Sequence, residues 1–297
     1  NNNALFSSQP AINSSGTLTF TTASNQNGSA TVTVGVSDDG GTAVSGDDDT
    51  SPNQTFTITV TAVNDEPSFT TNNITYLEDS GSNSTSSWAS NLSKGASNES
   101  SQTLTFTVSN NNNALFSSQP AINSSGTLTF TTASNKNGSA TVTVGLSDDG
   151  GTAVSGDDDT FADQTFTITL TAVNDEPSFT KGSNITVLED SGSSSTSNWA
   201  TSISTGPSDE SSQTPTFSVT NDSNSLFSSQ PAINSSGVLT FTPASNANGS
   251  ATVTVSVSDN GGTANSGADD TSSNQTFTVT ITAVNDDVTL TSAINNY

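Results

Sequence analysis

The chain has 297 residues, of which 29% are apolar and only 10% are charged. Its 28 acidic against 3 basic residues give a net charge of −25, so nucleic acid is not an expected partner and neither is an anionic membrane surface. Cysteine, methionine and histidine are absent, which excludes disulfides, thiolate or imidazole metal sites and thiol nucleophiles.

The chain is built from repeats. The stretch NNNALF recurs after 110 residues, and residues 1–50 differ from residues 111–160 only at Gln26/Lys136 and Val36/Leu146. A more divergent third copy starts near Asn224, and a landmark AVND occurs at 62–65, 172–175 and 283–286. We therefore expect a partial repeat that lacks its first strands, two complete repeats and a linker or the start of a next repeat, at residues 1–63, 64–173, 174–284 and 285–297, and we expect the whole to be a piece of a longer array.

Within each repeat, apolar residues alternate with polar ones at the period of a β-strand, as at Leu104, Phe106 and Val108. No stretch has apolar residues at helical spacing, and no apolar run approaches the roughly 20 residues of a membrane span. The strands expected in the complete repeat 64–173 are 72–77, 86–92, 103–109, 114–122, 127–131, 139–147 and 164–173. This predicts an all-β fold of tandem seven-stranded antiparallel Greek-key β-sandwiches in a linear array, with Trp88 and Trp199 in their cores.

Counting these strands alternately up and down places the acidic loops at the ends of the repeats. The exit end of repeat 64–173 would carry Glu78, Asp79, Asn135, Asn137 and the connector 174–176, whereas the facing end of the next repeat would carry Asp209, Glu210, Asp259, Asn260, Asp269 and Asp270. At about 4 Å each pair of like charges costs about 4 kcal/mol at an effective dielectric near about 20. Calcium, which binds oxygen ligands, would relieve this repulsion, so Ca²⁺ is the expected cofactor.

A purely structural interpretation of some acidic loops stays open. Asp-Gly and Asn-Gly pairs often serve only the backbone conformation of a turn, and acidic loops are commonly just solvated. For SDDGG at 147–151 taken alone, and for DDD at 157–159, metal binding and turn formation are equally open.

Several motifs together resemble the cadherin repeat. Residues 165–179, TFTITLTAVNDEPSF, resemble its last strand and calcium linker, DxNDNxPxF. LED at 77–79 resembles its glutamate motif, SDDGG at 147–151 resembles its AxDxG segment, and DE at 209–210 stands where that family has a DxD pair. AVND followed by LED is typical of the cadherin-like (Ig-like) tandem repeats of giant calcium-dependent bacterial surface adhesins.

The resemblance implies a set of calcium ligands. These are Asn64, Asp65, Glu99 and Asp148 at the first connector, Glu78, Asn174, Asp175, Asp209 and Asp259 at the second, and the equivalent positions Asp38, Glu189, Asn285 and Asp286 in the other copies. The family's LDRE motif is replaced here by ASNKNG at 133–138, and Asn98 stands where the next repeat has Asp209. We therefore expect fewer or weaker ions at each connector than cadherins hold.

The resemblance implies a secreted, cell-surface role that is mechanical and not enzymatic. The main hypothesis is an extender, or stalk, in which calcium makes the connectors between neighbouring repeats of the chain rigid. An alternative is a polymeric extracellular filament or sheath, in which strands from an identical chain complete the partial repeat. A glycan-binding accessory module is a weaker alternative, because near-identical copies argue against one unique site.

Overall fold

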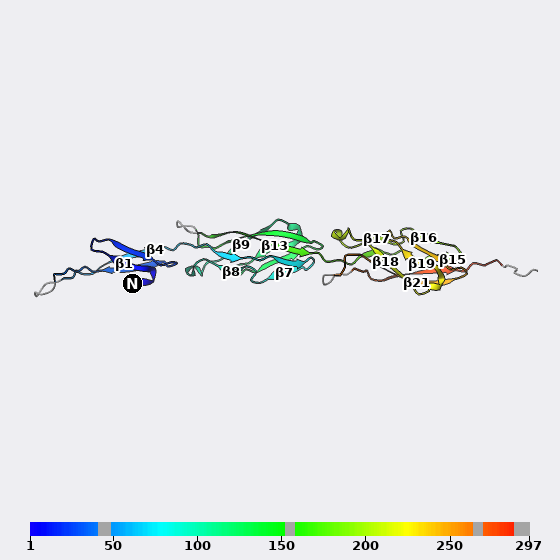
Figure 1. The fold of residues 1–297 in the computed structure, drawn as a ribbon, viewed down its shortest axis with the longest axis horizontal. Coiled ribbons are helices and arrows are strands. Elements are labelled where there is room, and N and C mark those ends of the chain that lie inside the picture. Colours follow the sequence, from blue (N-terminus) through cyan, green and yellow to red (C-terminus); the bar gives the residue numbers. More distant parts are fainter. Residues whose placement is uncertain (41–48, 152–157, 264–269, 288–297) are drawn as a thin grey trace, which may run out of the picture. The chain divides into compact units, whose positions relative to one another are not determined.

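The computed structural model describes residues 1–40, 49–151, 158–263 and 270–287. Within these ranges the fold is all-β, as predicted (Figure 1), and helical structure is limited to five 3-10 turns: η1 (Asn3–Leu5), η2 (Ser97–Glu99), η3 (Asn113–Leu115), η4 (Ser208–Glu210) and η5 (Asn224–Leu226). No helix in the described ranges has the length and apolar character needed to span a membrane.

The chain forms two compact units. One comprises residues 1–74, 82–131 and 139–168, and the other comprises 75–81, 132–138 and the chain from 169 onward. The repeat boundaries expected from the sequence remain a prediction.

The third repeat lies wholly within the second unit. It contains β14 (Ser178–Thr180), β15 (Ile185–Leu188), β16 (Ser194–Thr196), β17 (Thr201–Ser204), β18 (Thr216–Asn221), β19 (Phe227–Ile233), β20 (Leu239–Pro243), β21 (Gly249–Ser258) and β22 (Gln275–Thr282). A four-stranded sheet has the order β15-β22-β21-β18, a three-stranded sheet has the order β16-β20-β19, and β14 pairs with β17. Alternate residues, such as Val253, Val255 and Val279, are fully buried, which accounts for the period-two pattern.

Where one strand was expected at each of the first two positions of a repeat, the structure has a pair of short strands. β14 pairs antiparallel with β17, whereas β15 continues on the other sheet and pairs with β22 in parallel, from Ile185↔Val279 to Leu188↔Thr282. This pair departs from the expected all-antiparallel arrangement because the chain changes sheet after β14 without reversing direction. β16 and β17 are separated where Asn198 adopts a left-handed φ of 54°.

The tryptophan of each complete repeat lies in this break and packs in the core, as predicted. Trp199 is 3% exposed, its ring centroid is 4.3 Å from that of Phe277, and its Nε1 donates to the Ser183 carbonyl at 3.0 Å. Trp88 has the same surroundings, with Phe166 at 4.2 Å and the Asn72 carbonyl at 3.1 Å. The indole fills the core and has its one donor paired.

The second repeat has strands at equivalent positions: β5 (Ser68–Thr70), β6 (Ile74–Leu77), β7 (Ser82–Thr85), β8 (Ser90–Ser93), β9 (Thr105–Asn110), β10 (Phe116–Ile122), β11 (Leu128–Thr132), β12 (Gly138–Ser147) and β13 (Thr160–Thr171). The antiparallel pairs β5–β8, β7–β11 and β9–β12 correspond to β14–β17, β16–β20 and β18–β21. The two complete repeats therefore share one topology at these pairs.

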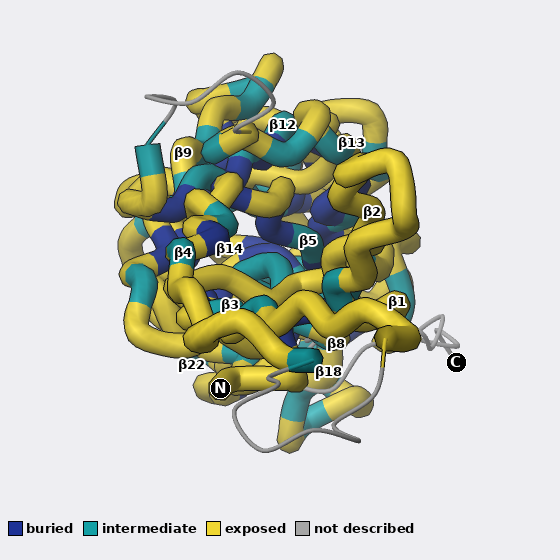
Figure 2. Tube along the Cα trace, turned by 90° about the vertical axis from the view of Figure 1, so that its left-hand side faces the viewer, coloured by how far each residue is buried: buried dark blue, intermediate teal, exposed yellow. Residues whose placement is uncertain are grey.

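The first repeat has β1 (Phe6–Ile12), β2 (Leu18–Thr22), β3 (Gly28–Val34) and β4 (Gln54–Val60), paired as β1–β2 and β3–β4. Leu18 and Phe20 are 36% and 40% exposed, whereas the identical side chains Leu128 and Phe130 of the second repeat are 0% and 3% exposed. β1 and β2 accordingly appear mostly yellow in Figure 2. The two copies therefore differ in the exposure of these side chains, although their sequences match at both positions.

Candidate functional site

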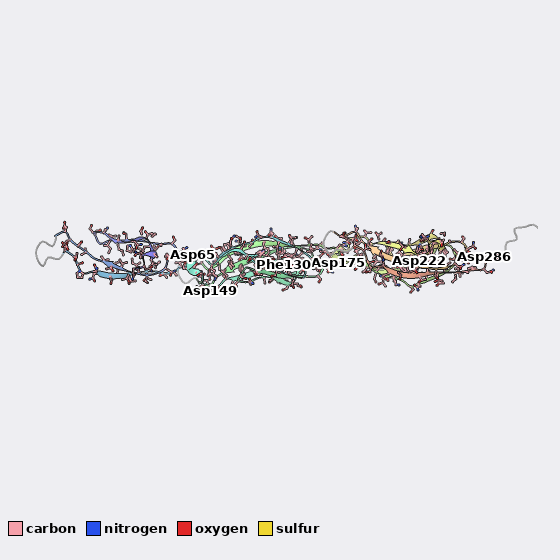
Figure 3. The ribbon with its side chains drawn as sticks, turned by 90° about the horizontal axis from the view of Figure 1, so that it is seen from below. Asp65, Phe130, Asp149, Asp175, Asp222 and Asp286 are labelled. Carbon is pink, nitrogen blue, oxygen red and sulfur yellow. The ribbon has the colours of Figure 1, made fainter. Side chains whose placement is uncertain are left out.

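The connector before the third repeat is held by two loops of that repeat, the loop between β17 and β18 and the loop after β21. Asn174 Nδ2 donates to Asp259 Oδ1 at 3.1 Å, and Asn174 Oδ1 accepts from Gln213 Nε2 at 2.8 Å. The backbone N–H of Asp175 donates to Glu210 Oε1 at 2.9 Å. Asp259 follows β21, and Glu210 ends the turn η4, so the connector meets the loops that strand parity assigned to this end. Figure 3 labels Asp175 at this position.

The exit loops of the second repeat reach the same connector. Glu78 directly follows β6, is only 2% exposed, and its Oε1 accepts from the backbone N–H of Val173 at 2.8 Å. Asn137 Nδ2 donates to Asp209 Oδ2 at 2.8 Å. The structure thus brings together Glu78, Asn174, Asp175, Asp209 and Asp259, the five candidate ligands expected at the second connector.

Burial and mutual repulsion disfavour the charged forms of these acids. Burial raises the pKa of Glu78, and the nearby Asp209 and Asp79 charges raise it further. Burial also raises the pKa of Asp175 and of Glu210, again with contributions from neighbouring aspartates. We refer to Glu78, Asp175 and Glu210 as the junction carboxyls. A nearby positive charge would stabilise the charged form of each junction carboxyl.

Several oxygens at this connector have no hydrogen-bond partner although they are buried. They are Glu78 Oε2, Glu210 Oε2, Asp259 Oδ2 and Gln213 Oε1. Such hard oxygen donors fit calcium chemically. In the described ranges, however, there is no group of three or more acidic side chains close enough together to hold an ion. The donor set therefore fits a divalent cation, while the coordination geometry is not formed in this structure.

The first connector repeats this arrangement within the first unit. Asn64 Nδ2 donates to Asp148 Oδ1 at 2.9 Å, and the backbone N–H of Asp65 donates to Glu99 Oε1 at 2.9 Å. Asp148 Oδ2 is buried and has no hydrogen-bond partner. The four candidate ligands predicted here lie together. Of the DDD run, Asp158 offers its carbonyl to Asn64 at 2.9 Å, while Asp157 lies outside the described residues, as does Asp269 of the third repeat.

The structure does not gather the remaining candidates in the same way. Asp38 is exposed and accepts from the backbone N–H of Gly40, as an ordinary turn residue does. Glu189 is buried with both oxygens paired, to Val284 N at 2.8 Å and to Asn248 Nδ2 at 3.2 Å. Asn285 and Asp286 are exposed. Their role as ligands remains a prediction from the resemblance.

The expected ligand set omits two features of the site. It lacks Glu210, whose carboxylate accepts from the connector backbone. It also lacks Gln102 and Gln213, each of which donates to the connector asparagine. The available signal was the tetrapeptide Glu-Ser-Ser-Gln, which occurs at 99–102 and again at 210–213.

No protein-family model matches the chain, and no match was found among curated proteins. Cadherin ectodomains are among the solved structures similar to it. Mouse protocadherin-24 EC1-3 is 17% identical with a TM-score of 0.45, covering 95% of this chain and 88% of that one. Mouse cadherin-23 EC22-24 is 16% identical with a TM-score of 0.42, covering 93% and 82%. Likeness at this level carries no argument about function, so the site rests on its own geometry.

Proposed function

We propose that this chain is a structural segment of an extracellular stalk, an extender of a bacterial cell-surface adhesin, whose connectors are made rigid by calcium. It acts mechanically and not as an enzyme. The observation that carries the proposal is the group of buried carboxylate oxygens without hydrogen-bond partners around residues 173–175. The pKa values of the junction carboxyls at the same place are raised. A shared divalent cation would convert their repulsion into attraction across the connector.

The expected affinity suits a secreted protein. Extracellular calcium modules bind with dissociation constants of about 10⁻⁴ to 10⁻³ M, which matches millimolar calcium outside cells. An ion present at ten times its dissociation constant stabilises the folded state by about 1.4 kcal/mol. This is enough to stiffen a connector, and chelation would reverse it.

Thermal unfolding and small-angle scattering of the full chain in calcium and in chelator test this function. We expect a higher melting temperature and a longer, narrower distribution of interatomic distances in calcium. A series with monovalent salt and chelator is the control, because screening alone also weakens repulsion. If calcium changes neither quantity beyond the salt control, calcium is not the stiffener.

A further inference from the structure

The asparagine of each connector lies between a glutamine and an aspartate in a series of two hydrogen bonds. We call this glutamine–asparagine–aspartate series the relay. At the second connector, Gln213 Nε2 donates to Asn174 Oδ1 at 2.8 Å, and Asn174 Nδ2 donates to Asp259 Oδ1 at 3.1 Å. The glutamine therefore determines the orientation of the asparagine amide, because the glutamine Nε2 donor needs the asparagine Oδ1 as its acceptor. The amide nitrogen is then left to face the carboxylate.

The first connector contains the same relay. Gln102 Nε2 donates to Asn64 Oδ1, and Asn64 Nδ2 donates to Asp148 Oδ1 at 2.9 Å. These residues belong to the first compact unit, whereas Gln213, Asn174 and Asp259 belong to the second. The arrangement is thus found in both connectors that precede a complete repeat.

The glutamine is held in place by its own backbone. The N–H of Gln213 donates to the Glu210 carbonyl at 2.9 Å, and the N–H of the next residue, Thr214, donates to Asn260 Oδ1 at 2.8 Å. The segment is therefore tied both to the turn η4 and to the loop after β21. A side chain mounted on such a frame can position its partner with little loss of rotamer entropy.

A glycine makes room for the relay. A Cβ at Gly261 would overlap Oδ1 and Cγ of Asn174, and a Cβ at Gly150 would overlap the same atoms of Asn64. Both glycines follow the aspartate of the relay by two residues, and their N–H groups donate to that aspartate, at 3.0 Å for Gly261 and 2.9 Å for Gly150. The second glycine of the repeated Gly-Gly pairs does not have this role, because nothing lies within 4 Å of a Cβ at Gly262.

We propose that Gln102 and Gln213 are positioning residues of an amide lock that fixes each connector to the following repeat without a bound cation. The lock consists of the glutamine, the connector asparagine and the aspartate that directly follows β12 or β21. It works together with Glu210, whose carboxylate holds the next connector residue through its backbone N–H. Its donors are neutral amides, so it neutralises no charge and remains formed in a chelator. This inference concerns the cation-free protein and goes beyond the proposed calcium function.

The test is solvent exchange of amide protons in the ¹⁵N-labelled full chain in excess chelator. Gln213→Leu removes the donor at nearly constant volume. We expect the Asn174 carboxamide protons to lose their protection and the backbone amides of Asp175 and Gly261 to exchange about fivefold to tenfold faster, as the loss of one hydrogen bond implies. Gly261→Ala should produce the same changes by displacing Asn174 directly.

The chain provides matched internal controls. In Gln213→Leu the signals of Asn64, Asp65 and Gly150 should not change, and in Gln102→Leu these signals should change while those of Asn174, Asp175 and Gly261 should not. Unaltered exchange at Asn174 and Asp175 in Gln213→Leu would overturn the lock. Faster exchange throughout the third repeat, including the core amides of Val253 and Val279, would also overturn it, because the glutamine would then serve general stability.

A calcium titration of the same wild-type sample separates this inference from the proposed function. If calcium leaves every signal unchanged while Gln213→Leu releases Asn174, the stalk proposal fails and the lock stands. If calcium shifts the connector signals while Gln213→Leu has no effect in chelator, the lock fails and the stalk proposal stands.

Discussion

Replacing Glu78 by glutamine should have opposite effects on stability without and with calcium. Glu78 is 2% exposed, its Oε1 accepts from Val173 N–H, and its Oε2 is buried without a partner. Burial raises the pKa of Glu78 most and the charges of Asp209 and Asp79 raise it further, which outweighs the lowering by the Val173 N–H and the Asn137 side chain, so the folded state disfavours the charged form. Glutamine keeps the acceptor for Val173 and removes the charge.

The size of the effect follows from the unpartnered oxygen. A buried polar group without a partner costs about 1–3 kcal/mol, and more when it is charged. Part of this cost should be recovered in Glu78→Gln, because the new amide nitrogen can donate toward the neighbouring carboxylates. A gain of about 1 kcal/mol raises the melting temperature of a domain of this size by about 4 °C. In calcium the variant lacks a charged ligand and should be less stable than wild type.

Glu189→Gln is the matched control. Both oxygens of Glu189 already accept hydrogen bonds, from Val284 N–H and from Asn248 Nδ2. Glutamine would place a donor against the Asn248 donor, so this variant should lose about 1 kcal/mol in chelator. The measurement is calorimetric unfolding at constant ionic strength, with and without calcium. If Glu78→Gln is destabilised in chelator as Glu189→Gln is, burial of an unpartnered charge at Glu78 is refuted.

Further variants and conditions test the rest of the fold. In chelator, the free energy of unfolding should fall as pH rises above about 4.5. The raised pKa of each junction carboxyl means that the folded state binds more protons than the unfolded state just above this pH. Urea midpoints measured across pH would show this fall, and midpoints that rise with pH would contradict it. Leu128→Ala should cost about 2–5 kcal/mol, and Leu18→Ala clearly less, because only Leu128 is buried; equal losses in urea titrations would contradict the exposed face of the first repeat. Gly126→Ala should destabilise more than Gly16→Ala, since its Cβ would lie 2.7 Å from the Ala89 carbonyl and Gly16 has open space; the same titrations compare them, and equal effects would show that left-handed backbone strain alone decides.

The later strands of each repeat could be predicted well from the sequence, and the earlier ones could not. Period-two alternation located β9, β11 and β12 to within two residues, because alternate residues are buried in β11 and β12 and half-buried in β9. The expected strand 72–77 contains β6 but misses β5, and the expected strand 86–92 covers the break between β7 and β8, where Ser87 has a φ of 54°. A left-handed serine has no sequence signature comparable to that of glycine.

Some features of the candidate site could likewise be predicted from the sequence, and others could not. Alternating strand direction predicts Glu78 and Asp259 at one connector, and the structure pairs Glu78 with Val173 and Asp259 with Asn174, while their role as ligands stays a prediction. The burial of Glu78 could not be foreseen, since glutamate is rarely buried and its paired backbone donor lies 95 residues away. The role of Gln213 could not be foreseen either, because it depends on a hydrogen bond to Asn174, which lies 39 residues away in the sequence.

Calorimetric titration of the full chain with calcium tests the central claim most directly. The account predicts saturable binding with a dissociation constant of about 10⁻⁴ to 10⁻³ M, weakened in Glu78→Gln and unaffected by monovalent salt beyond ordinary screening. The absence of any saturable heat at millimolar calcium, or identical binding by the wild type and Glu78→Gln, would contradict it.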